Sequence, residues 1–146
     1  MNLPQLAKVR SRSDDHFVGW FYTETWQASF HLIWPVTQQQ TKTYVKQLHG
    51  FDLKGEGSFN GKTIEIIKNG ATGCYIIALR RWYFTPRWIS VLTHELQHAT
   101  TWLLRDRGMV LNGDSEEAYA YLLESTMRQS LEILNGPLKP WEWGKK

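Results

Sequence analysis

The chain has 146 residues, of which 42% are hydrophobic and 14% aromatic, and its formal net charge is +3 at pH 7. That length and that apolar content are enough for one ordinary domain with a sizeable core, which favours a folded domain over a disordered protein. The charge is mild and the pI is near 9.0, so we expect no specific nucleic acid partner.

Cysteine usage and hydrophobic patterning indicate the compartment. Cys74 is the only cysteine, so a secreted scaffold held by disulfides within the chain is excluded. Residues 1–15 lack the apolar segment of a signal peptide, and no stretch approaches the ~20 apolar residues of a membrane helix. We therefore expect a cytoplasmic protein with no membrane partner.

The first half of the chain is rich in predicted strands. Residues 17–23 and 28–34 are aromatic and β-branched runs, ended by Pro35, and they indicate an antiparallel pair. A short helix is expected over 37–48, capped by Thr37 and ended near Gly50, with an inward face formed by Tyr44, Val45 and Leu48.

Two Asn-Gly pairs, at 60–61 and 69–70, mark turns in the following segment. They bound two further predicted strands, 62–68 and 74–79. Strands over about 16–80 followed by helices predict an α+β domain.

The strongest helical pattern covers residues 86–106. Thr85 is an N-cap residue and Pro86 suits the first helical position, while Gly108 offers the left-handed residue that ends a helix. Apolar side chains recur at spacings of three and four and predict a buried stripe of Trp88, Leu92, Leu96, Ala99 and Leu103.

Within this helix, residues 94–98 read His-Glu-Leu-Gln-His. Side chains four apart lie on one face of a helix, so His94 and His98 can direct two imidazole nitrogens at one point. Zinc accepts neutral imidazole, and a catalytic zinc has three protein ligands and one open position. Glu95, rotated by about 100° from His94, is placed beside the metal, where a general base belongs.

A second helix is expected from 114 to about 134, stopped by Gly136 and Pro137, and the short loop 107–113 folds it back antiparallel to the first. Its acidic side chains are candidates for the third ligand, but the spacing alone does not select among Glu116, Glu117 and Glu124. Glu117 also has a structural interpretation, because with Asp114 as N-cap it occupies the third helical position of a capping box.

The His-Glu-x-x-His motif, followed 18 to 19 residues after His98 by glutamates in an alanine-containing helix, resembles the zincin metallopeptidases of the gluzincin type. It is also similar to small zincin-like proteins encoded by phages and prophages. The resemblance covers about residues 75–130. It implies that the glutamate directly before Ala118, which is Glu117, is the third zinc ligand.

The resemblance further implies a zincin-like fold, in which an antiparallel or mixed sheet packs on the metal helix. An edge strand of such a sheet receives an extended peptide. Residues 74–79 are a candidate for that edge because they lead into the metal helix. Their apolar sequence is equally consistent with an interior strand.

Two functional hypotheses follow for a single domain over 1–146, with the metal helix pair at about 86–134. The first is a zinc-dependent hydrolase, a small metallopeptidase that cleaves a peptide or protein substrate, with His94, His98 and Glu117 as Zn²⁺ ligands and Glu95 as general base. The alternative is a non-catalytic phage virion or assembly protein that retains a structural or decayed zinc site and binds a phage structural protein. A phage-encoded protein would act in the host cytoplasm or in the virion.

Overall fold

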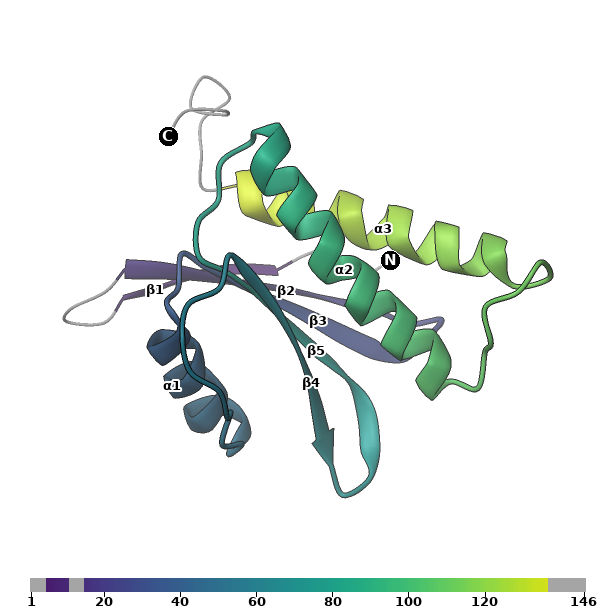
Figure 1. The fold of residues 1–146 in the computed structure, drawn as a ribbon, viewed down its shortest axis with the longest axis horizontal. Coiled ribbons are helices and arrows are strands. Elements are labelled where there is room, and N and C mark those ends of the chain that lie inside the picture. The colour runs from purple at the N-terminus through teal and green to yellow at the C-terminus, as the bar shows by residue number, and fades with distance from the viewer. Residues whose placement is uncertain (1–4, 11–14, 137–146) are drawn as a thin grey trace.

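A computed structural model describes residues 5–10 and 15–136 of the chain. The elements in chain order are β1 (Gln5–Arg10), β2 (Asp15–Thr23), β3 (Ala28–Trp34), α1 (Gln38–His49), β4 (Gly61–Lys68), β5 (Ala71–Leu79), α2 (Pro86–Asp106) and α3 (Glu116–Asn135). One sheet separates the helices: α2 and α3 lie on one face and α1 lies on the other (Figure 1). The predicted α+β class is confirmed. The predicted domain also includes 1–4, 11–14 and 137–146, which lie outside the described residues.

The sheet is mixed and has the strand order β1-β2-β3-β5-β4. β2 and β3 pair antiparallel from Phe17 opposite Trp34 to Thr23 opposite Ala28, so the predicted pair is confirmed. β3 and β5 pair in parallel, and the chain crosses between them through α1 and β4. The N-terminal strand β1, which extends the sheet beside β2, was not predicted.

The hairpin of β4 and β5 turns at Asn69 and Gly70, as the Asn-Gly pair predicts. Their φ angles of 51° and 76° are both positive, which is the requirement of a type I′ hairpin turn. The first Asn-Gly pair does not form a turn between two strands, because Gly61 is already the first residue of β4.

The edge strand on this side of the sheet is β4, and the expectation that residues 74–79 form an edge is wrong. β5 lies between β3 and β4, and its residues 75–79 are buried. Their continuous apolar sequence is the pattern of a strand covered on both faces.

Helix α1 begins and ends as predicted. Thr37 and Gln40 form a capping box, and Gly50 closes the helix with a φ of 65°. Leu48 is not inward as expected, since 61% of its surface is exposed. In the last turn His49 faces the sheet instead and its ring meets the ring of His31.

The sheet therefore carries one hydrophobic core on each face. The larger core packs α2 and α3 against the face that holds Phe21, Phe30 and Tyr75. The smaller core packs α1 against the opposite face, where Ile64 and Ile76 lie. Among the residues that the structure describes, no helix has the length and apolar content needed to cross a membrane.

Candidate metal centre

Helix α2, which carries the motif, has the predicted limits Pro86–Asp106. At its end, Gly108 has a φ of 78°, and the amides of Gly108 and Met109 donate to the carbonyls of Arg105 and Leu104. These two bonds are those of a Schellman motif, which ends a helix at a left-handed glycine. The predicted apolar stripe is buried against the sheet.

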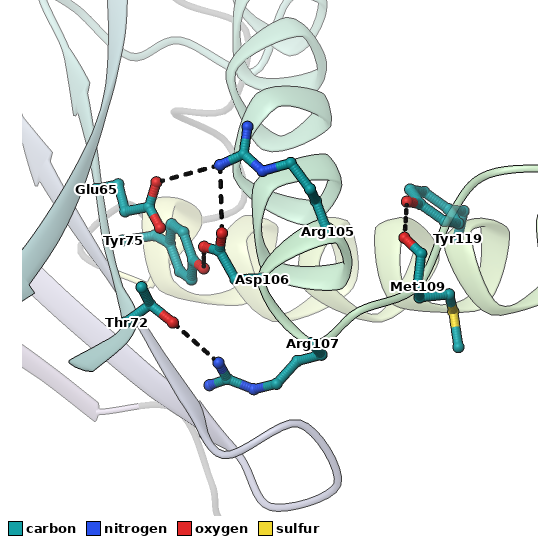
Figure 2. Close-up of polar contacts among 8 residues, drawn as sticks. All are labelled: Glu65, Thr72, Tyr75, Arg105, Asp106, Arg107, Met109 and Tyr119. Carbon is teal, nitrogen blue, oxygen red and sulfur yellow. Dashed lines mark hydrogen bonds and ion pairs between the residues drawn. The ribbon is translucent and has the colours of Figure 1, made fainter. Parts of the chain in front are cut away.

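Polar contacts fix the C-terminal turn of α2 on the sheet, as Figure 2 shows. The Tyr75 hydroxyl donates to Asp106 Oδ2 at 3.0 Å. Arg105 Nη2 lies 3.3 Å from Asp106 Oδ1 and 3.6 Å from Glu65 Oε2. Burial and the neighbouring Asp106 carboxylate raise the pKa of Glu65 to about 7, although Arg105 acts in the opposite direction. The Glu65 carboxyl therefore gains a proton as the pH falls through about 7.

Arg107, the residue after α2, ties the helix to the turn between β2 and β3. Its guanidinium donates to the carbonyls of Trp26 at 2.9 Å and Gln27 at 3.0 Å, and to the Thr72 hydroxyl at 3.0 Å. The arginine guanidinium has five N–H donors in a fixed plane, so it can donate to these three acceptors at the same time. The helix that presents the motif is thus held at one end by two arginines and a carboxylate.

His94 and His98 converge on the exposed side of α2. Their Nε2 atoms are 3.1 Å apart, and their rings meet edge to face at 84°. Two nitrogens bound to one tetrahedral zinc at about 2.0–2.1 Å would be roughly 3.3 Å apart, so the pair fits two ligands of a zinc ion. The same distance suits one N–H···N hydrogen bond when no metal is bound.

The ring of His98 stacks on Trp102 at a centroid distance of 5.7 Å and an angle of 27°. Trp102 lies one turn further along the same helix. A large flat neighbour restricts the rotation of the imidazole, so Trp102 helps to keep Nε2 directed at His94.

Glu95 points away from the histidine pair, into the contact between α2 and β4. Only 7% of its surface is exposed. The Thr63 hydroxyl lies 2.6 Å from Glu95 Oε2 and 2.9 Å from the Glu95 carbonyl oxygen. The motif therefore joins the exposed histidines to an edge strand through a buried carboxylate.

Gly61 explains how α2 approaches β4 so closely. A Cβ atom at this position would lie 2.7 Å from Val91 Cγ1, 2.8 Å from Glu95 Cγ and 3.2 Å from Glu95 Oε1. Distances below 3.0 Å are clashes, so only glycine allows the present separation of helix and strand.

The structure does not bring Glu117 to the histidine pair. Within 5–10 and 15–136, no three His, Cys, Asp or Glu side chains are grouped so that they could hold a metal ion. Glu116 and Glu117 are exposed in the first turn of α3, while Glu124 is exposed and pairs with Arg128 at 3.2 Å. The role of Glu117 as a ligand stays a prediction.

The capping box proposed for Glu117 is not formed. The N-cap of α3 is Ser115, with no side-chain cap hydrogen bond. Asp114 belongs to the preceding turn, where its amide donates to Asn112 Oδ1 at 2.9 Å. The carboxylate of Glu117 is thus free of a capping role.

One contact fixes which part of α3 lies beside the motif. Thr93, the neighbour of His94, donates to Met127 Sδ at 3.7 Å, and at the far end Trp82 donates to Asn135 Oδ1 at 2.9 Å. The two helices therefore run in opposite directions, as predicted. Glu117 precedes Met127 by ten residues, which is about 15 Å along a helix, whereas Glu124 precedes it by less than one turn.

Sequence reasoning missed three residues of this site. Thr63 and Gly61 lie more than thirty residues before Glu95, and their contacts arise only when β4 packs on α2. Trp102, at four residues from His98, could have been identified from helical spacing.

In the comparisons with known proteins, no family model matches the chain, and no curated protein or solved structure matches it significantly.

Proposed function

We propose that this protein is a zinc-dependent hydrolase with a zincin-like arrangement that cleaves peptide bonds. The observation that carries the proposal is the convergence of His94 and His98, whose Nε2 atoms are 3.1 Å apart on an exposed helix face. Zinc would activate a water molecule and polarise the carbonyl to be attacked. Glu117 is the proposed third ligand on the strength of the resemblance to gluzincin-type metallopeptidases, which selects the glutamate directly before Ala118, with Glu116 and Glu124 as alternatives.

In this proposal Glu95 is the general base. Its carboxylate takes a proton from the attacking water and returns it to the nitrogen of the leaving amine. Thr63 suits both protonation states of Glu95. Its hydroxyl donates to the charged carboxylate at 2.6 Å, and it can accept from the protonated acid while it donates to the Glu95 carbonyl at 2.9 Å.

The free edge of β4 supplies a binding path for an extended peptide. The Arg80 amide donates to the Asn60 carbonyl, which sets the alternation of the ladder between β4 and β5. By this alternation the backbone groups of Gly61, Thr63 and Glu65 point to the open edge. A peptide that pairs there by β-strand addition lies directly beside Glu95.

Hydrolysis by the zinc-loaded protein tests this proposal. The wild type should cleave unstructured peptides, lose activity with a chelator and regain it with zinc. Glu95→Gln keeps the size of the side chain and removes the base, so turnover should fall by about 10²- to 10⁴-fold. Unchanged zinc content in Glu95→Gln is the control, and equal turnover in both proteins would reject Glu95 as the base.

A second candidate function is favoured by the burial of Glu95. A carboxylate with 7% exposure and a threonine partner is also an anchor between α2 and β4. In that case the protein is a non-catalytic interaction or phage assembly protein that keeps a metal site. The Glu95→Gln variant distinguishes the two candidates, since an anchor role lowers stability and leaves no turnover to lose.

A further inference from the structure

A cavity of about 620 Å³ lies on the other side of β4, between the start of α1 and the loop before β4. Its walls come from 37–39 and Lys42 of α1, from 56–59 of the loop, and from Arg80 at the end of β5. Neither the histidine pair nor Glu95 lines it. The cavity is large enough for an amino acid side chain and its first hydration shell.

The cavity carries an excess of positive charge that the protein does not neutralise. Lys42 and Arg80 face one acidic residue, Glu56, and the structure forms no ion pair among these three described residues. Arg80 Nε is buried and has no hydrogen-bond partner among the residues that the structure describes. A buried donor that is left unpaired is unfavourable, so Arg80 Nε favours an acceptor from outside the chain.

A third cation lies at the rim. Gln38 Nε2 reaches the Gly55 carbonyl at 3.4 Å, which brings the loop to the cavity. Lys62 Nζ lies 3.8 Å from the position of a Cβ atom on Gly55, and Lys62 has no acidic partner among the described residues. Lys42 and Arg80 therefore line a space that suits a carboxylate, and Lys62 lies near Gly55, the neighbour of the lining residue Glu56.

The position of the cavity relates it to the proposed peptide path. Arg80 and Asn60 pair directly before β4 begins, so the cavity lies at the Gly61 end of the free edge. Side chains two residues apart in a strand lie on the same face of the sheet, so Arg80 lies on the same face as Ala78. Helix α1 covers this face. Side chains of a peptide on the β4 edge would alternate between this face and the face of Glu95.

We propose that this cavity binds a carboxylate of the peptide substrate, so that the protein selects peptides with an acidic group near the residue beside Gly61. This inference rests on the proposed function, because it places the peptide on the edge of β4. It adds the substrate class, which the histidine pair and Glu95 do not determine.

Peptide binding to the zinc-loaded Glu95→Gln protein, followed by amide chemical shifts, tests the inference without any turnover. Two acetylated and amidated pentapeptides, Ala-Ala-Glu-Ala-Ala and Ala-Ala-Gln-Ala-Ala, differ only in charge. The glutamate peptide should bind about tenfold more tightly, since a hydrogen bond to a charged group contributes about that factor. A third peptide, with glutamine and a free C-terminal carboxylate, distinguishes a side chain from a chain terminus as the source of the charge.

Lys42→Gln and Lys46→Gln form a matched pair of variants. Lys46 lies one turn after Lys42 on α1 and pairs with Asp52 at 3.1 Å instead of lining the cavity. The charge preference should fall below about twofold in Lys42→Gln and stay near tenfold in Lys46→Gln. A preference that is equal in both variants would overturn the inference, as would equal binding of all three peptides.

The same titration separates failure of the inference from failure of the proposed function. If all three peptides shift the resonances of Gly61 and Thr63 equally, the peptide path on β4 stands and the carboxylate site does not. If no peptide shifts them, both the path and the carboxylate site are rejected. A preference for the free C-terminus alone supports the site and assigns its ligand to a chain end.

Discussion

The Thr63 hydroxyl lies 2.6 Å from Glu95 Oε2, and this contact joins the edge strand to the metal-binding motif. The two residues are 32 positions apart in the chain. The contact gives the carboxylate a fixed position between α2 and β4, with a partner that can donate or accept a hydrogen bond. Thr63 is therefore the positioning residue of the proposed general base.

Replacement of Thr63 by valine should affect both stability and turnover. It removes the hydroxyl at nearly constant volume and leaves the buried Glu95 without its partner, which costs about 1–3 kcal/mol in the free energy of unfolding. Loss of the fixed carboxylate should lower turnover by about 10- to 100-fold. Urea unfolding and peptide hydrolysis measure the two effects. Thr63→Ser keeps the hydroxyl and should lie near the wild type; a serine variant as poor as the valine variant would show that the methyl group matters instead.

Gly61→Ala tests the close approach of α2 to β4. The added Cβ would meet Val91 Cγ1 at 2.7 Å and Glu95 Cγ at 2.8 Å, so we expect a loss of about 1–3 kcal/mol, as for an overpacked core. Gly113→Ala is the control, since a Cβ there meets no atom of the described residues within 4 Å. Thermal unfolding of both variants gives the comparison. Equal melting temperatures would mean that the helix and strand separate without penalty.

The free energy of unfolding should contain a contribution from Glu65 that decreases with rising pH. Burial and Asp106 raise its pKa to about 7, above the value of about 4.3 in an unfolded chain. The folded state therefore binds the extra proton, and this stabilisation is complete below about pH 4.3 and lost as the pH rises through 7. His31 acts with the opposite sign, because burial and then His49 lower its pKa to about 4.

The difference between the wild type and Glu65→Gln isolates this contribution. Glutamine stays neutral at every pH and can still donate to Asp106. Relative to the variant, the wild type should become less stable between pH 5 and pH 8 in urea unfolding experiments. A difference that is constant across this range would contradict the raised pKa of Glu65.

Zinc titration of three glutamine variants identifies the third ligand. Loss of a zinc ligand should weaken zinc binding by orders of magnitude, whereas replacement of a glutamate that does not contact the zinc should leave the affinity nearly unchanged. The proposal expects this effect for Glu117→Gln, and not for Glu116→Gln or Glu124→Gln. Glu132→Gln is a control on the same helix, at an exposed position. If only Glu124→Gln loses zinc, the third ligand is the glutamate nearest the contact between Thr93 and Met127, and the ligand implied by the family resemblance is wrong.

Helix ends and tight turns could be predicted from the sequence because their signals are local. Thr37 caps α1, Pro86 opens α2, Gly108 closes α2, and Asn69 and Gly70 form the hairpin turn. Each of these residues acts through its own backbone angles or through a partner within one helical turn. No information from the rest of the fold was needed.

Contacts between distant segments could not be predicted in the same way. The order of strands places β4, and not β5, at the edge, and this follows from the parallel pairing of β3 with β5. The N-cap of α3 is Ser115 and not the predicted Asp114, because the Asn112 side chain accepts hydrogen bonds from the amides of both residues. The identity of the third ligand depends on the rotation of α3, which local sequence does not determine.

Zinc binding by the histidine pair is the central claim, and its direct test is the zinc content and affinity of four proteins. The wild type should bind one zinc ion per chain, His94→Ala and His98→Ala should lose it, and Gln97→Ala, exposed between the two histidines, should bind as the wild type does. Zinc should also raise the melting temperature of the wild type and of Gln97→Ala only, since a ligand that binds the folded state stabilises it. A wild type that binds no zinc, or histidine variants with unchanged zinc affinity, would contradict the metal centre.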